Sequence, residues 1–461
     1  MNRFILLLVL LLFTNLSQAQ CLITGADLSY VNTIEQNGGI YKDESGVNVD
    51  PYEFFAQKGT GMIRLRLWHT PENFTSAGGN PITSSNLSDV LYASQRAVQN
   101  GMDLNISIHY GDYFNDPGKQ LRPAAWQGLT QTTLLDSIYR YTYHVLEKLY
   151  EQNTVPAIVS IGNETTYGFI DASSPTNGFS WPADAEKYNA GLSAVDDFNQ
   201  QYSQNVKKAV HFTESTASWL AGLFEDKGVT NFDVIGVSYY PNFSPNTDLQ
   251  ELGQLISNLV NSTGKEVMIF ETGFIWTTSN GDSYGNFMGN NGNVLNYPVS
   301  PDGQRSFLLD LAATVYENGG TAVFYWEPAW ISSGMYDLWG HGSSYENASL
   351  FKFNNNNSAL PGFDFFDFCS PTAMNEPPEA ERVLVFPNPS NGVFQIESKA
   401  PLSAWELYDI TGKLTHSGQF DPSSGSYSLC LENRLKGLYF LHLLTSKHKN
   451  IMTKVVFLAV H

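Results

Sequence analysis

The chain has few cysteines and few positive charges, and both shortages exclude classes of protein. Its 461 residues include only Cys21, Cys369 and Cys430, which lack the short spacing of a metal site. Lys and Arg number 25 against 45 Asp and Glu, so the net charge is −20. Residues 20–381 alone contain 16 basic and 40 acidic residues. Such an acidic body repels nucleic acid but not a neutral polymer such as a polysaccharide, so we expect no nucleic-acid partner.

Long apolar runs are also absent, except at the N-terminus. Phe4–Phe13 is followed by Ser17–Ala19, a pattern typical of a signal peptide that is cleaved after Ala19, so we assign residues 1–19 to it. A lipoprotein anchored through Cys21 is the alternative, but Gln18 and Gln20 do not fit its signal. No later stretch has the length and apolar character of a transmembrane helix. We therefore predict an exported protein with no integral membrane segment in its mature form.

A Pro- and Glu-rich segment, 371–381, is predicted to be a linker between two domains, 20–370 and 382–461. The second domain contains short alternating strands separated by Gly-, Asn- and Ser-rich turns. The predicted strands are 382–386, 393–397, 404–408 and 438–443. This pattern predicts a small C-terminal β-sandwich.

Several motifs of the second domain occur in a distinctive order. They are Val385–Pro389, Asn391–Gly392, Leu407–Gly412, Gly437–Tyr439 and Lys454–Val456. In these motifs the domain resembles the C-terminal sorting domain of the type IX secretion system. The resemblance implies the type IX secretion machinery as a partner, and a secreted or cell-surface location. A carbohydrate-binding sandwich is the alternative.

The first domain alternates eight short apolar runs with helical stretches such as 136–150. The runs are 22–27, 62–68, 104–109, 157–162, 209–212, 234–240, 267–271 and 321–326. This alternation predicts an α/β fold, a (β/α)8 TIM barrel. Because a closed barrel brings its termini together and export permits disulfides, we expect Cys21 to pair with Cys369. Three unpaired cysteines are the alternative.

Polar residues end several of these runs, and the chemistry of a TIM barrel lies at the C-terminal ends of its strands. Glu164 follows the fourth run, and Glu271 ends the seventh. Hydrolysis of a glycosidic bond needs one carboxylic acid that protonates the leaving oxygen and a second carboxylate that attacks or activates water. Burial and mutual repulsion should separate the pKa values of two such groups. The pair therefore predicts a glycoside hydrolase.

Other residues near the strand ends are expected to bind substrate or support the pair. Asn163 could bond a sugar 2-hydroxyl, while a strand-end arginine or tyrosine could keep the nucleophile ionised. His109 has no partner at metal-ligand spacing, so we assign it a positioning role. The full set is Asp27, Arg64, Arg66, His109, Asp112, Trp126, Asn163, Tyr239, Tyr240 and Trp326.

Longer motifs run along nearly all of the first domain: Gly25–Ser29, Arg64–Trp68, His109–Gln120, Ile161–Glu164, Ile235–Pro241 and Val323–Trp330. In these it resembles glycoside hydrolase family 53, the arabinogalactan endo-β-1,4-galactanases. The resemblance implies a retaining double-displacement cleavage of (arabino)galactan, with Glu164 as acid/base and Glu271 as nucleophile. One alternative is another retaining glycanase of the same clan, such as a mannanase or cellulase. The other is a non-catalytic glycan-binding protein on a decayed barrel.

The chain departs from this family at three places. Gly111 and Phe114 replace the usual Ser and Trp, and Asn242–Phe243 replaces an aromatic pair, so the sugar subsites differ. Many bacterial members bind calcium in the loop after the seventh strand. Here Asp282 and Asn286 remain, whereas Asn280 and Tyr284 replace two ligands. Because calcium prefers several oxygen ligands including carboxylates, we expect no required cofactor and at most a weak calcium site at Asp282 and Asn286.

Overall fold

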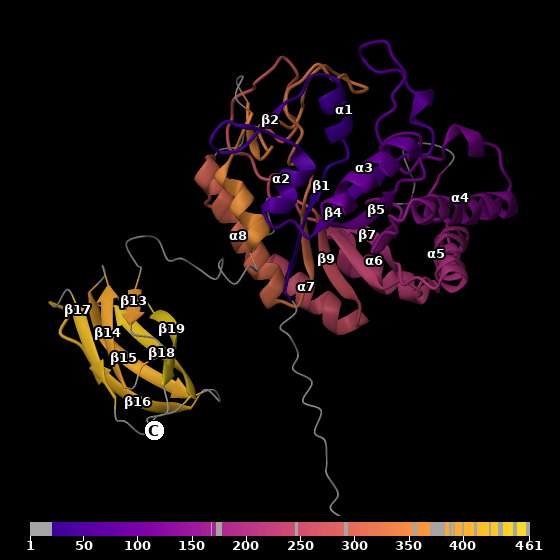
Figure 1. The fold of residues 1–461 in the computed structure, drawn as a ribbon. Coiled ribbons are helices and arrows are strands. Elements are labelled where there is room, and N and C mark those ends of the chain that lie inside the picture. Colours follow the sequence, from indigo (N-terminus) through magenta and orange to yellow (C-terminus); the bar gives the residue numbers. More distant parts are fainter. Residues whose placement is uncertain are drawn as a thin grey trace, which may run out of the picture. The chain divides into compact units, whose positions relative to one another are not determined.

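The computed structural model describes most of the chain. The described residues are 21–166, 168–171, 178–244, 248–289, 294–353, 357–368, 383–386, 390, 392–398, 401–409, 413–423, 426–431, 437–445 and 450–457. The predicted signal peptide and linker, and Cys369, lie outside them. The chain divides into two compact units, Met1–Ser370 and Pro371–His461 (Figure 1).

Eight parallel strands of the first unit form a closed barrel, which confirms the predicted TIM barrel. The order around the barrel is β1-β10-β9-β8-β7-β6-β5-β4. The strands are β1 (Ile23–Asp27), β4 (Met62–Leu67), β5 (Asp103–Ile108), β6 (Ile158–Ile161), β7 (Lys207–Thr213), β8 (Val234–Ser238), β9 (Glu266–Glu271) and β10 (Ala322–Tyr325). Each coincides with one predicted run to within a few residues.

Helices surround these strands (Figure 1). They are α1 (Val31–Gln36), α2 (Pro51–Gln57), α3 (Leu87–Gln99), α4 (Gln131–Glu151), α5 (Ala183–Tyr202), α6 (Glu214–Asp226), α7 (Leu249–Thr263) and α8 (Pro301–Glu317). Side-chain caps fix the N-termini of several helices. At α3 the Asn86 side chain accepts from the Asp89 amide, and at α7 Asp248 forms a capping box with Glu251. The 3₁₀ turns are η1 (Pro71–Asn73), η2 (Ala124–Trp126) and η3 (Pro361–Asp367).

A small sheet that the sequence analysis did not foresee also belongs to the first unit. Its strand order is β11 (Phe351–Lys352), β12 (Ser358–Ala359), β2 (Tyr41–Lys42) and β3 (Asn48–Val49). Each of these strands has two residues, too few for a pattern of alternating hydrophobicity to appear.

The barrel interior changes from apolar to polar along the strands. Side chains alternate across a strand, so Met62, Arg64 and Arg66 share one face of β4. Met62 packs in a buried apolar cluster with Phe270 and Phe324. A Cβ at Gly25 would lie 2.3 Å from the Phe324 ring, so only glycine admits this packing. The apolar cluster fills one level of the interior, and the arginines of the same face lie beyond it toward the C-terminal ends of the strands.

The second unit consists of two antiparallel sheets. One contains β13 (Val383–Phe386), β14 (Val393–Ser398) and β17 (Ser426–Cys430). The other has the order β16 (Leu414–Gln419), β15 (Leu402–Asp409), β18 (Gly437–Thr445) and β19 (Asn450–Phe457). Phe394 and Ile396 of the first sheet share one buried cluster with Leu407 and Leu441 of the second. The shared core confirms the predicted β-sandwich.

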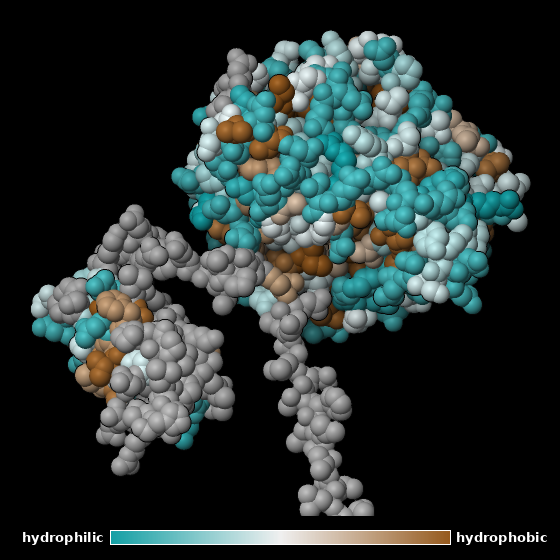
Figure 2. Space-filling model, in the orientation of Figure 1, coloured by the Kyte–Doolittle hydropathy of each residue, from teal (hydrophilic) through white to brown (hydrophobic). Residues whose placement is uncertain are grey.

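The surface of the barrel unit and the described cysteines can be compared with the sequence analysis. Figure 2 shows a mostly hydrophilic face on the barrel unit, with apolar residues in scattered small areas. Among the helices that the structure describes, none has the length and apolar character of a membrane span. Cys21 is disulfide-bonded, whereas Cys430 is free and exposed. The other half of the expected pair, Cys369, lies outside the described residues.

Candidate active site

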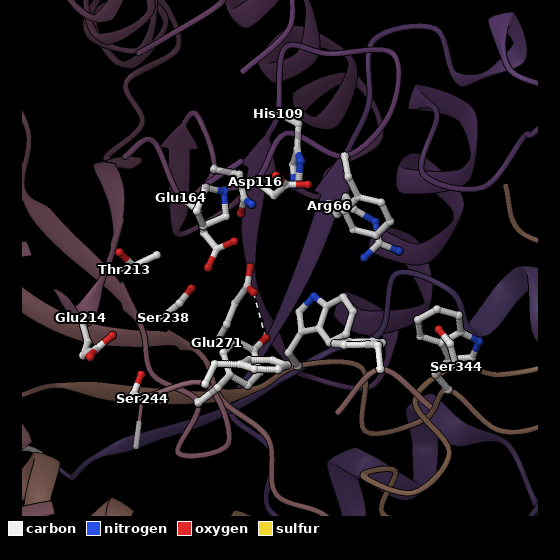
Figure 3. A pocket seen from close by; sticks show the side chains of 18 of the residues that line it. Arg66, His109, Asp116, Glu164, Thr213, Glu214, Ser238, Ser244, Glu271 and Ser344 are labelled. Carbon is white, nitrogen blue, oxygen red and sulfur yellow. Dashed lines mark hydrogen bonds between the residues drawn. The ribbon is translucent and has the colours of Figure 1, made fainter. Parts of the chain in front are cut away.

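A cavity of about 820 Å³ lies at the C-terminal ends of the barrel strands (Figure 3). Glu164 and Glu271 both line it. Around them lie aromatic side chains, which present the apolar ring faces on which sugar rings stack. The aromatic lining residues are Phe114, Tyr240, Phe243, Tyr284, Phe287, Trp326, Trp330 and Trp339.

Glu164 lies in a strained turn just beyond β6. Its φ is +45°, a left-handed conformation that residues other than glycine rarely adopt. The Gln120 amide donates to the backbone carbonyls of Asn163 and Glu164, at 2.8 and 3.3 Å. Burial, reinforced by the nearby charge of Glu271, raises the pKa of Glu164 to about 8. The side chain is therefore suited to hold a proton at neutral pH.

Glu271 ends the regular strand β9 and has one ion-pair partner and one hydrogen-bond donor. Arg64 Nη1 lies 2.9 Å from its Oε1, and the Tyr240 hydroxyl donates to its Oε2 at 2.9 Å. Burial raises the pKa of Glu271, while Arg64 and the Tyr240 hydrogen bond oppose that rise. A cation and a phenol in contact favour the ionised form, so the two glutamates differ in the way that acid and nucleophile must differ.

Arg64 connects Glu271 to other buried polar groups. Its Nη1 also lies 2.8 Å from Asp27 Oδ2, and its Nη2 donates to Asn163 Oδ1 at 2.7 Å and to Ser107 Oγ at 3.1 Å. Asp27 and Arg64 are almost completely buried. Arg64 therefore contacts Glu271 directly, and Asp27 is connected to Glu271 through Arg64.

Arg66, two residues further along β4, forms a separate buried pair. Its Nη2 lies 2.9 Å from Glu327 Oε1. The guanidinium also lies over the rings of Tyr30 and Phe114, at 4.3 and 4.7 Å from their centroids. Burial raises the pKa of Glu327 to about 8, and Arg66 opposes that rise. Arg66 itself lines the cavity.

Some of the remaining predicted residues line the cavity, and others lie outside its lining. His109, Asn163, Tyr240 and Trp326 line the cavity; Asp112, Trp126 and Tyr239 are not among its lining residues. Asp112 accepts from the Thr70 amide at 3.1 Å and the Ala124 amide at 2.8 Å, so it joins two loops. Trp126 packs on His69. The Tyr239 amide donates to the Glu271 carbonyl at 2.9 Å.

His109 is buried beside two arginines, and burial lowers its pKa well below the ordinary value. Its Nδ1 accepts from the Asn115 amide at 3.2 Å, so the ring proton is on Nε2. That nitrogen has no hydrogen-bond partner among the residues that the structure describes. A neutral His109 can therefore donate to a ligand in the cavity.

His211 and Ser238 are among the residues in or near the cavity that the sequence analysis did not foresee. His211, on β7, bonds Asn163 through Nδ1 at 3.0 Å, and its Nε2 lies 2.9 Å from Ser238 Oγ. Ser238 ends β8 and faces Glu164 in the cavity (Figure 3). Both lie inside predicted strands. Their only signal was a polar residue at an inward position of an otherwise apolar run.

The expected calcium ligands, Asp282 and Asn286, bond to protein groups in this structure. Asp282 accepts from the Tyr284 amide through Oδ1, at 2.7 Å, and from the Ser343 amide through Oδ2, at 2.9 Å. The Asn286 side chain donates to Asn280 Oδ1 at 2.7 Å. Within the described part of the chain no group of three or more His, Cys, Asp or Glu could hold a metal. These contacts show a loop that is cross-linked by its own hydrogen bonds.

Each of the two units matches a known protein family. Residues 23–366 match Glycosyl hydrolase family 53, and residues 384–457 match the Secretion system C-terminal sorting domain. An arabinogalactan endo-β-1,4-galactanase of Cellvibrio japonicus is 39% identical over 346 residues, which are 74% of this chain and 89% of that protein. An endo-β-1,4-galactanase of Bacillus subtilis is 31% identical over 383 residues, 75% of this chain and 85% of that protein. The GH53 catalytic domain of Ignisphaera aggregans superposes with a TM-score of 0.67 at 31% identity, covering 76% of this chain and 96% of that one.

Proposed function

The chain belongs to glycosyl hydrolase family 53, and from that membership we propose that its cavity cleaves β-1,4-galactosidic bonds inside (arabino)galactan, with Glu164 as acid/base and Glu271 as nucleophile. The observation that carries the assignment is the unequal environment of the two carboxyl groups. Glu271 contacts a guanidinium and a phenol, whereas burial and the charge of Glu271 favour the protonated form of Glu164.

In the first step, the Glu271 carboxylate attacks the anomeric carbon of the sugar. Glu164 gives its proton to the glycosidic oxygen as the bond to the leaving chain breaks. The product is a glycosyl-enzyme ester on Glu271. Arg64 and Tyr240 keep the attacking carboxylate ionised and oriented before the attack.

In the second step, Glu164 acts as a carboxylate and takes a proton from water. That water attacks the anomeric carbon, breaks the ester and frees Glu271. Two inversions at the same carbon give net retention of configuration. The raised pKa of Glu164 serves both steps, because a group that titrates near neutrality can give and regain a proton.

The sorting domain indicates a secreted or cell-surface protein. We include in the proposal that residues 1–19 are a signal peptide, that 20–370 carry the activity, that 371–381 are a linker and that 382–461 bind the type IX secretion machinery. No step of the proposed reaction passes through a metal or another cofactor.

The test combines substrate choice with two variants. Purified protein should release galacto-oligosaccharides from potato galactan, and much less sugar from mannan or cellulose. Glu164→Ala should lose at least about 10²-fold on galactan, since general acid catalysis typically contributes 10²- to 10⁴-fold. Azide should intercept its glycosyl-enzyme with retained configuration when an activated aryl galactobioside is the substrate.

Glu271→Ala should be inactive on both substrates, and azide should rescue it with inverted configuration. Glu225→Ala, at an exposed position of α6, is the matched control. The opposite pattern of anomeric configuration would exchange the two roles. Full activity in both variants would disprove the site, and a preference for mannan or cellulose would disprove the substrate.

A further inference from the structure

Asn163 begins a chain of buried hydrogen bonds whose directions can be assigned. Its Oδ1 accepts from Arg64 Nη2 at 2.7 Å, and its Nδ2 donates to the Asn115 carbonyl at 3.0 Å. A flipped amide would place two donors against each other at Arg64 and two acceptors at Asn115. The orientation of the amide is therefore unique, and its oxygen faces His211.

The tautomer of His211 follows from this orientation. Its Nδ1 lies 3.0 Å from Asn163 Oδ1, and an amide oxygen can only accept, so Nδ1 carries a proton. Burial, and then the charge of Arg64, lower the pKa of His211 well below its ordinary value, so the ring is neutral. A neutral ring has one proton, and Nε2 is consequently an acceptor.

Ser238 completes the chain. Its Oγ lies 2.9 Å from His211 Nε2, a distance at which two lone pairs would repel, so the hydroxyl donates to the ring. The single hydroxyl proton of Ser238 is thus occupied. The same oxygen is within hydrogen-bonding reach of the Glu164 carboxyl (Figure 3). A hydroxyl that donated to the carboxylate would lower the pKa of Glu164. The only hydroxyl proton of Ser238 is bonded to His211, however, so toward Glu164 the oxygen presents lone pairs.

From this geometry we propose that His211 and Ser238 are a positioning pair that holds an acceptor against Glu164 and so selects its protonated form. Only a carboxylic acid O–H can bond to such an oxygen; a carboxylate meets lone pairs instead. The inference rests on the proposed role of Glu164 as acid/base. It assigns a function to two residues that do not themselves exchange protons with the substrate.

Other charged groups also affect the pKa values of Glu164 and His211. Glu164 is faced by Glu271 of β9 and Asp116 of the loop after β5, which raise its pKa, and by Arg64 of β4, which lowers it. His211 is faced by Arg64 of β4 and His109 at the end of β5. None of these groups contributes the directional contact that Ser238 makes, so the effect of the pair can be separated from theirs.

The pair also matters after the first proton transfer. Glu164 has then given its proton to the leaving oxygen and is a carboxylate facing Ser238 lone pairs. This contact favours recovery of a proton from the attacking water, which is the step that Glu164 must perform next. One fixed acceptor therefore promotes both the acid form before cleavage and the uptake of a proton during hydrolysis.

The test is the alkaline limb of the pH profile of kcat/KM, where activity falls as Glu164 loses its proton. Ser238→Ala removes the acceptor, so the limb should move to lower pH by about half a unit to one unit. His211→Leu frees the Ser238 proton to bond the carboxylate, and should move the limb in the same direction and further. Ser238→Thr keeps the hydroxyl and should leave the limb in place. Ser137→Ala, on the outer helix α4, is the control.

A limb that moves to higher pH in Ser238→Ala would overturn the proposal, because that result means the hydroxyl donates to the carboxylate. An unmoved limb with a uniformly lower rate would also overturn it and would indicate a structural role only. If these variants fail to fold, neutron diffraction on the wild-type protein tests the proposal directly. A hydrogen on His211 Nε2 would refute the proposed directions of the hydrogen bonds.

A further variant separates this proposal from the one on which it rests. In Glu164→Gln, assayed on an activated aryl substrate, the alkaline limb should disappear. If it persisted, the role of Glu164 itself would be wrong. If it disappeared while Ser238→Ala moved the limb upward, only the positioning pair would be wrong.

Discussion

Arg64 contacts two buried carboxylates at once. This arrangement predicts the direction in which the pKa of Glu271 changes when Asp27 or Arg64 is replaced. One guanidinium nitrogen lies 2.8 Å from Asp27 Oδ2 and 2.9 Å from Glu271 Oε1. Burial raises the pKa of Glu271, Arg64 lowers it, and the charge of Asp27 raises it. Asp27→Asn removes a like charge and leaves Arg64 fully available to Glu271. Arg64→Gln removes the cation and leaves both carboxylates.

The size of the effect follows from the geometry. The two contacts through one nitrogen place the carboxylates within about 6 Å, where unit charges interact by about 3 kcal/mol at an effective dielectric of 20. One pKa unit corresponds to about 1.4 kcal/mol, so Asp27→Asn should lower the pKa of Glu271 by one to two units. Arg64→Gln should raise it by at least as much, since the Arg64 cation is in direct contact with Glu271 at 2.9 Å and lies closer to it than Asp27 does.

The assay is the acid limb of kcat/KM on an aryl β-1,4-galactobioside. Glu271 must be ionised to attack, so activity falls as the pH drops through its pKa. Asp27→Asn should shift the limb to lower pH, and Arg64→Gln should shift it to higher pH. Shifts in the same direction would refute the reasoning, and so would an unchanged limb in a folded Asp27→Asn variant. Circular dichroism of both proteins verifies that the variants are folded.

Three other outcomes are expected. Tyr240→Phe removes the 2.9 Å donor to Glu271 and should lower kcat/KM by about 10- to 100-fold while its acid limb moves to higher pH; an unaltered limb would contradict the contact. Glu327→Ala leaves Arg66 buried without its partner and should reduce the free energy of unfolding in urea by about 3 to 5 kcal/mol, whereas Glu327→Gln should lose less; equal losses would contradict an electrostatic cause. Removing residues 372–461 should preserve galactan hydrolysis but abolish delivery outside the cell, because every described residue of the cavity lies in the first unit; a folded but inactive truncation would instead indicate a substrate-binding role for the sandwich.

The barrel, and the position of Glu164 and Glu271 at the C-terminal ends of its strands, could be predicted from the sequence because the signals are strong there. Parallel strands buried on both faces are continuous apolar runs, and a charged residue at the end of such a run is conspicuous. Glu164 and Glu271 both follow runs of this kind. The TIM-barrel rule then places strand ends on one face of the molecule, without any knowledge of side-chain contacts.

Other features depend on contacts that no local pattern encodes. Asp112 follows a strand as Glu164 does, yet its carboxylate joins loop amides and is not part of the cavity lining. His211 was hidden within a predicted strand because its partners are 48 and 27 positions away in the chain. In the sandwich, β16 was missed because residues 414–419 are largely polar, although they pair with β15 over its length.

The backbone itself separates the environments of the two glutamates. Glu271 belongs to β9, and its carboxylate lies deep in the barrel beside Arg64. Glu164 lies three residues beyond the last residue of β6, in a left-handed conformation whose cost is of the order of 1 to 3 kcal/mol. The two hydrogen bonds from Gln120 stabilise that turn.

Glu327, which follows β10 and pairs with Arg66, has φ +47° and is the other strand-end glutamate with this strain. Regular strand geometry would have directed successive side chains alternately into and out of the barrel. The strained turn removes Glu164 from that alternation and lets its carboxyl face Ser238, while Arg64 contacts Glu271. The left-handed turn at Glu164 therefore gives two identical side chains of one cavity different partners, and these partners favour different protonation states.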